Sequence, residues 1–169
     1  MKQMPPPIKK RLAHKVTKKK QKIFLVHGQN EGVREKVARF LERLGCVPLI
    51  LHELPSKGKT IFQKFSDHSE VEFAVVLLTA DDQGGPAGVS LDKQQKRSRQ
   101  NVILELGFFL GKLGSEKVCS LYEDGVEIPS DHSGVVYVPL GTDDRWKTLL
   151  ARELQSAGIR VKPDKLLTI

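Results

Sequence analysis

Five short apolar runs, separated by segments of helical periodicity, constrain the fold of this 169-residue chain more than any other feature. Most of these runs are bounded by polar residues or glycine, which is typical of strands in a parallel sheet covered on both faces. The runs lie at residues 23–26, 47–51, 73–78, 118–122 and 135–138. Apolar residues recur at helical spacing in the segments 31–44, 61–68, 99–114 and 143–157. This alternation predicts an α/β fold with a five-stranded, mainly parallel sheet, helices on both faces and the most apolar run, 73–78, at its centre.

The positive charge of the chain is concentrated at its N-terminus. The formal net charge is +8, whereas residues 1–22 alone contain nine Lys and Arg side chains and no acidic residue. The remainder is therefore close to neutral, and we predict a disordered basic leader at 1–22, one domain at 23–160 and a C-terminal tail at 161–169. The leader could contact nucleic acid weakly through phosphates, but it has no Phe, Tyr or Trp on which bases would stack.

Composition excludes several classes of protein. No apolar run approaches the roughly 18 residues that a membrane-spanning helix needs, and the charged, proline-rich opening residues are unlike a secretory signal. The two cysteines, Cys46 and Cys119, lie in apolar segments and are predicted to be core residues rather than metal ligands or disulfide partners. We therefore expect a cytoplasmic protein with no metal site and no contact with a membrane.

The apolar helix predicted at 99–114 contains a carboxylate in an unusual place. Between Arg99 and Lys112, its one charged residue is Glu105. A carboxylate in so apolar a segment costs free energy unless it is paired, protonated or directed at a wet cleft. Two interpretations follow: Glu105 lies at an exposed edge of the helix and is simply solvated, or it is a functional group.

Further candidate residues follow the predicted strands. In an open α/β sheet, ligands bind beyond the carboxyl ends of the strands, near the point where the strand order reverses. The first turns of the helix 99–114 are expected at the same edge. The candidates there are His27, Gly28, Gln29, Lys57, Lys59, Asp81, Asp82, Asn101 and Glu105.

Most of these candidates have a structural alternative. His27 could be a hydrogen-bonded structural histidine, and the lysines of the loop 52–60 could be solvated. Gly28 could relieve a tight turn or let backbone N–H groups approach a phosphate. The adjacent carboxylates Asp81 and Asp82 are weak grounds for a metal site. A dinucleotide fingerprint is excluded, because no G-x-G-x-x-G or P-loop pattern occurs.

Several segments, in the same order, resemble a known protein family. They are residues 22–28 (KIFLVHG), 56–61 (SKGKTI), 73–82 (FAVVLLTADD), 99–114 (RQNVILELGFFLGKLG) and 126–135 (VEIPSDHSGV). The resemblance, which spans roughly residues 22–160, is to the bacterial TIR-like domains that act as effectors of cyclic-oligonucleotide antiphage systems, including those fused to STING-like sensors. It implies a flavodoxin-like TIR fold and, as in active members, cleavage of NAD⁺ to nicotinamide and an ADP-ribose product.

The resemblance also implies roles for individual residues. By motif, Glu105 corresponds to the catalytic glutamate of TIR enzymes, and the loop 52–60 to the BB loop that borders the site. An ionised Glu105 would bond to the ribose hydroxyls and stabilise the oxocarbenium-like ribose that forms as the N-glycosidic bond breaks. Asn101, one turn earlier, replaces the aromatic residue of many eukaryotic TIR domains. The residues expected to line the nucleotide are His27, Gly28, Gln29, Asp81 and Asp82, with Lys57 or Lys59 near its phosphates.

The same resemblance implies the partners of the protein. NAD⁺ is the expected substrate, and no separate cofactor is expected. Self-association through TIR–TIR contacts is expected, because the active site of the family is completed between subunits. Family members usually carry a sensor domain, so we expect a separate sensor protein, or the basic leader, to trigger assembly. Two alternatives stay open: a non-catalytic TIR assembly module, and a nucleotide-binding or nucleoside-processing domain that uses the same cleft.

Overall fold

The computed structural model of the chain describes residues 21–51, 63, 71–129 and 134–162. The leader up to residue 20, most of the segment 52–70 and the last residues from 163 lie outside these ranges. The candidates Lys57 and Lys59 therefore also lie outside the described residues. Within the described part of the chain, no helix is both long enough and apolar enough to cross a bilayer.

The five predicted strands form one parallel sheet, which confirms the predicted fold class. They are β1 (Lys22–Val26), β2 (Val47–Leu49), β3 (Phe73–Leu78), β6 (Val118–Tyr122) and β7 (Val136–Pro139). Their order across the sheet is β2-β1-β3-β6-β7, and every neighbouring pair is parallel. Counted along the chain, this is the flavodoxin-like order, in which the direction of winding reverses next to β1. All six residues of β3 are buried, so the most apolar run is the central strand as predicted.

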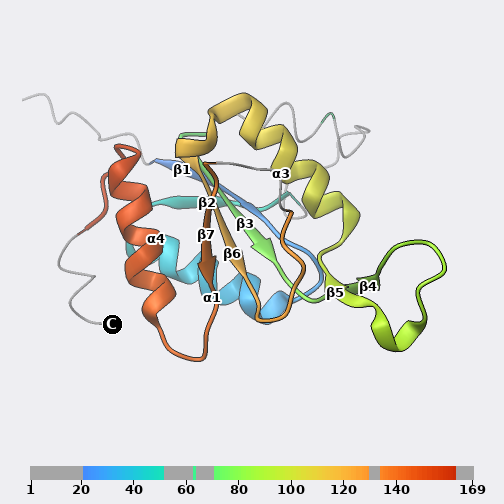
Figure 1. Cartoon of the computed structure of the whole chain (residues 1–169). Coiled ribbons are helices and arrows are strands. Elements are labelled where there is room, and N and C mark those ends of the chain that lie inside the picture. The colour runs from blue at the N-terminus through green and yellow to red at the C-terminus, as the bar shows by residue number, and fades with distance from the viewer. Residues whose placement is uncertain (1–20, 52–62, 64–70, 130–133, 163–169) are drawn as a thin grey trace, which may run out of the picture.

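Among the described residues, three α-helices cover the two faces of this sheet. They are α1 (Glu31–Arg43), α3 (Gln100–Leu113) and α4 (Arg145–Ser156), with short 3₁₀ turns at Leu91–Lys93 (η2) and Ser115–Lys117 (η3). Figure 1 shows α1 and α4 on one face of the sheet and α3 on the other. The two faces have separate cores, because alternate side chains of a strand point in opposite directions. Ile23 and Leu25 of β1 face α1 and α4, whereas Phe24 and Val26 face α3.

The region 79–98, between the predicted strand 73–78 and the predicted helix 99–114, contains a small hairpin. Strands β4 (Asp82–Gly84) and β5 (Gln95–Arg97) pair in the antiparallel sense, and η2 lies in the connection between them. The main chain of β5 also contacts the segment after β6, because Glu127 N donates to Lys96 O over 2.8 Å. Figure 1 shows the hairpin beyond the carboxyl end of β3, beside the start of α3. This hairpin forms one wall of the pocket described below.

Candidate functional site

The carboxyl ends of β1, β3 and β6 meet at one edge of the sheet, which we call the carboxyl edge. His27 follows β1, is half-buried, and lies with Nδ1 2.8 Å from the carbonyl oxygen of Gly28. The ring therefore donates from Nδ1, which makes Nε2 the acceptor nitrogen of its neutral form. Gln29, two residues after His27, is exposed. The fold thus places the three predicted residues after β1 at the edge where ligands bind in this class of sheet.

Gly28 and Asp81 lie in direct contact at this edge. A Cβ atom on Gly28 would lie 1.7 Å from Oδ2 of Asp81 and 3.2 Å from Oγ1 of Thr79. The carboxylate of Asp81 is held in this position by the Thr79 hydroxyl, which donates to Oδ2 over 2.7 Å. A side chain at position 28 would therefore have to displace the Asp81 carboxylate, which occupies the space of a β-carbon. The structure thus brings together residues that the sequence analysis named separately.

Glu123, which follows β6, is a residue of this edge that the sequence analysis missed. Its Oε1 accepts a hydrogen bond of 2.8 Å from Asn30 Nδ2, and its Oε2 accepts one of 2.9 Å from the backbone N–H of Ala80. The side chain thus joins the β1–α1 loop to the β3–β4 connection. A signal was present, since Glu123 directly follows the apolar run 118–122, as the other candidates follow earlier runs.

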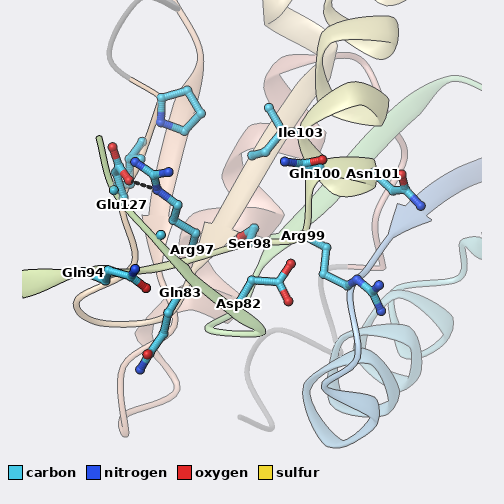
Figure 2. Close-up of a pocket in the computed structure, with 14 residues that line it drawn as sticks. Asp82, Gln83, Gln94, Arg97, Ser98, Arg99, Gln100, Asn101, Ile103 and Glu127 are labelled. Atoms are coloured by element: carbon cyan, nitrogen blue, oxygen red, sulfur yellow. Dashed lines mark hydrogen bonds and ion pairs between the residues drawn. The ribbon is translucent and has the colours of Figure 1, made fainter. Parts of the chain in front are cut away.

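Asp82 and Asn101 line a pocket of about 1060 Å³ between the β4–β5 hairpin, the start of α3 and residues 127–129. Figure 2 shows amide side chains from both walls, Gln83 and Gln94 from the hairpin side and Gln100 from α3. Arg97 of β5 pairs with Glu127 across the pocket. Neither Glu105 nor His27 is among the described residues that line this pocket. The candidate residues therefore do not share one described cavity.

Glu105 lies in the second turn of α3, on the flank that also carries Asn101. Residues four apart share a flank of a helix, whereas Ile103 falls on the opposite flank. Figure 2 shows Asn101 and Ile103 directed to opposite sides of the start of α3. The pocket is lined by both Asn101 and Ile103 but not by Glu105, which lies one turn further along the helix than Asn101. Glu105 therefore lies outside the described pocket.

The environment of Glu105 is apolar. The helix packs through Val102, Leu106 and Phe109, which are almost fully buried, and Glu105 beside them is half-buried. Burial raises the pKa of Glu105 from 4.5 to about 7. No hydrogen-bonding or charged group among the described residues contributes to this shift. The carboxyl group therefore titrates near pH 7, and a group with so shifted a pKa is a candidate for function.

The ordinary metal ligands do not cluster in the described part of the chain. No group of three or more His, Cys, Asp or Glu side chains there could hold a metal ion. Cys46 and Cys119 are buried and unbridged, as the sequence analysis predicted for core residues. Burial raises the pKa of their thiols to about 11 and about 12, so neither is a reactive thiolate at neutral pH.

Comparison with known proteins gives a consistent family. The model of the family described as CAP12/Pycsar effector protein, TIR domain, matches residues 22–142. The protein YuaY of Escherichia coli K12 is 44% identical over 149 residues, which cover 88% of this chain and 49% of YuaY. Protein tirC of Dictyostelium discoideum is 33% identical, covering 69% of this chain and 63% of tirC. The Pycsar effector protein BcPycTIR of Burkholderia cepacia is 32% identical over 81 residues, 47% of this chain and 25% of that protein.

The matched part of the chain therefore spans only part of each relative, from 25% of BcPycTIR to 63% of tirC. The match to the family model includes β1, β3 and α3, and hence both Glu105 and the residues of the carboxyl edge.

Proposed function

Because the chain belongs to the TIR-domain family of CAP12 and Pycsar effector proteins, we propose that it is an antiphage effector that cleaves NAD⁺. The model of this family matches residues 22–142. The products are nicotinamide and an ADP-ribose. Glu105 is the catalytic carboxylate of this proposal.

The state of Glu105 is the observation that carries the proposal. A half-buried carboxyl group with a pKa of about 7 and no partner among the described residues has an energetic cost that a purely structural position would not need. A bound ribose would supply the missing hydrogen bonds through its hydroxyl groups. A ribose with developing positive charge would also favour the ionised carboxylate, because an opposite charge lowers the pKa of an acid.

The proposed reaction breaks the bond between ribose C1′ and the ring nitrogen of nicotinamide. The bonding electron pair goes to that nitrogen, which thereby loses its positive charge and leaves as neutral nicotinamide. The ribose becomes oxocarbenium-like, and the Glu105 carboxylate stabilises its positive charge. A water oxygen then bonds to C1′ and releases a proton. Since the leaving group departs neutral, the proposal needs neither a second acid, nor a metal, nor a separate cofactor.

The carboxyl edge supplies the proposed contacts to the rest of the substrate. His27 places its imidazole ring at this edge, oriented by the contact of Nδ1 with Gly28 O, and Asn101, four residues before Glu105, lies on the same flank of α3. The residues proposed to contact NAD⁺ are His27, Gly28, Gln29, Asp81, Asp82 and Asn101, together with Lys57 and Lys59.

Assembly and a sensor partner complete the proposal. Relatives of the chain are named as Pycsar effectors and as CD-NTase-associated proteins, and the second name supports a separate partner. We propose that a cyclic-nucleotide signal, received by a sensor region or partner, drives TIR domains of this chain into assemblies in which the site is active. The expected signature is turnover that rises more steeply than linearly with protein concentration.

Nicotinamide release across a protein concentration series tests the proposal. We expect wild type to cleave NAD⁺ at high concentration and Glu105→Gln to lose roughly 10²- to 10³-fold in kcat, the usual cost of losing one transition-state-stabilising group. Glu42→Gln is the matched control, because Glu42 is an exposed glutamate on α1, across the sheet. If wild type that is demonstrably assembled leaves NAD⁺ intact, the enzyme proposal is wrong and an assembly or nucleotide-binding role replaces it.

A further inference from the structure

Glu123 connects two loops that are far apart in the sequence. Its Oε1 accepts from Asn30 Nδ2, 93 residues away, and its Oε2 accepts from the N–H of Ala80, 43 residues away. The backbone N–H of Glu123 itself donates to Leu78 O over 3.0 Å, so the residue is anchored to the end of β3. One side chain therefore links the ends of β1, β3 and β6.

A carboxylate is needed for this pair of bonds. Both partners are N–H donors, and each takes one of the two carboxylate oxygens. Glutamine has the same shape but only one acceptor oxygen, because its amide nitrogen is a donor. A glutamine at this position would lose one of the two bonds, because its amide nitrogen, a donor, would lie opposite one of the two N–H donors. Hydrogen bonds to a carboxylate are also the stronger kind.

Asn30 is held from both ends of its side chain. Its Oδ1 accepts from Val33 N over 3.1 Å and caps α1, while its Nδ2 donates to Glu123. The cap fixes Asn30 relative to the helix, and Glu123 fixes it relative to β6. The preceding residues 27–29 are therefore tethered at both ends, by β1 on one side and by Asn30 on the other.

The second tethered loop carries the acidic candidates. Ala80 precedes Asp81 directly, and the Asp81 carboxylate packs against Gly28 where a Cβ would lie 1.7 Å from it. Glu123 thus sets the separation of two loops that contact each other through Gly28 and Asp81. These loops carry most of the described residues that are proposed to contact the substrate, whereas Glu105 lies on α3.

We propose that Glu123 is a positioning residue that holds the loops 27–30 and 79–82 in the geometry required for nucleotide binding. This inference rests on the proposed function for its substrate, and it assigns substrate affinity to Glu123 while the chemical step stays with Glu105. Loss of either Glu123 bond therefore raises KM for NAD⁺ more than it lowers kcat. A purely structural residue would lower Tm and leave KM unchanged.

Exchanging the amide group of Asn30 and the carboxylate of Glu123 between the two positions provides the test. In Asn30→Asp the helix cap is kept, because an aspartate also caps well, but the donor to Glu123 is lost and two carboxylates face each other. In Glu123→Gln one acceptor is lost. In the double variant, the amide nitrogen introduced at position 123 would donate to the carboxylate introduced at position 30, while the amide oxygen accepts from Ala80 N. Both bonds then return, with the direction of one reversed.

We expect KM for NAD⁺ to rise about tenfold in each single variant, with kcat changed by less than about threefold, and to return to within about threefold of wild type in the double variant. Asp124→Asn is the matched control, because it removes an exposed carboxylate one residue away. Single variants with unchanged KM, or a double variant that is as impaired as the worse single one, would overturn the role of Glu123.

Amide hydrogen exchange without NAD⁺ separates this inference from the proposed function. We expect faster exchange in residues 27–30 and 79–82 of both single variants, recovery in the double variant, and no change in α4. If wild type proves unable to cleave NAD⁺, the proposed function fails, while the exchange pattern still decides whether Glu123 holds the loops. Unchanged exchange in these loops overturns the inference even if NAD⁺ is cleaved.

Discussion

The two faces of the sheet are built differently. On the face covered by α1 and α4, Trp146 is fully buried and packs edge-on against Phe40, with ring centroids 5.2 Å apart. On the face covered by α3, Phe109 packs against Phe24 at 4.8 Å, but the same helix carries the half-buried Glu105 and the 65% exposed Leu104. One face is a closed apolar core, whereas the other combines a core with polar and exposed features.

The solvent sides of the helices differ in the same way. Lys36 of α1 and Lys147 of α4 both pair with Asp144, at 3.4 Å and 2.7 Å, so charged pairs join α1 to the start of α4. The outer side of α3 instead carries Leu104, Gly107 and Gly111, all of them exposed. The comparison indicates that the α1–α4 face mainly supplies stability, and that the α3 face gives up some stability for the groups it carries.

Trp146→Ala should produce the largest loss of stability and sharpens the comparison directly. Removing a fully buried tryptophan costs about 3–5 kcal/mol, through lost burial and the cavity left behind. Leu104→Ala on α3 is the control and should cost less than about 0.5 kcal/mol, because Leu104 is exposed. Urea denaturation followed by circular dichroism measures both. Equal losses at the two positions would contradict the contrast between the faces.

The pH dependence of turnover follows from the position of Glu105. If the ionised carboxylate is the reactive form, kcat/KM for NAD⁺ should fall about tenfold for each pH unit below 7 and level off above it, since the pKa of Glu105 is about 7. His27→Gln distinguishes this from titration of the histidine and should keep the same profile. A flat wild-type profile between pH 5 and 8 would exclude Glu105 as the titrating group.

Glu105→Gln should stabilise the protein while it lowers kcat roughly 10²- to 10³-fold. The pKa of Glu105 is raised from 4.5 to about 7 in the folded state, so between these values the folded state holds a proton that the unfolded state releases. Stability therefore decreases as the pH rises from 4.5 to 7, and the cost is complete above pH 7. Removing the ionisable group should restore on the order of 1–3 kcal/mol at about pH 8 and little at about pH 4.5. Destabilisation at the higher pH would show that the Glu105 carboxylate makes a favourable structural contact.

The sequence predicted the elements that depend on local patterns. Apolar runs gave the five strands, and the helical spacing over 31–44, 99–114 and 143–157 predicted α1, α3 and α4. The β4–β5 hairpin was not predicted, because its strands Asp82–Gly84 and Gln95–Arg97 are polar and show no alternation of buried side chains. A pattern of apolar residues cannot identify strands whose side chains are mostly polar and exposed.

The candidate site was predictable only in part, because much of it depends on long-range contacts. Position after a strand placed His27, Gly28 and Asp81 at one edge, but the hydrogen bonds of Glu123 span 43 and 93 residues and leave no local signal. The pKa of Glu105 likewise depends on tertiary packing, because burial by neighbouring side chains raises it to about 7.

Gly107→Ala and Gly111→Ala should have the smallest effect and test whether the outer side of α3 is open in the monomer. Among the described residues, nothing lies within 4 Å of a Cβ built at either position, and both glycines lie within the helix. Each alanine should therefore raise the free energy of unfolding by about 0.5–1 kcal/mol through its higher helix propensity. Gly45→Ala is the contrasting control and should destabilise, because Gly45 ends α1 with φ at 92°. Destabilisation by alanine at 107 or 111 in dilute protein would show that this side of α3 packs closely against another segment, and the contrast between the two faces would then be smaller than the described residues indicate.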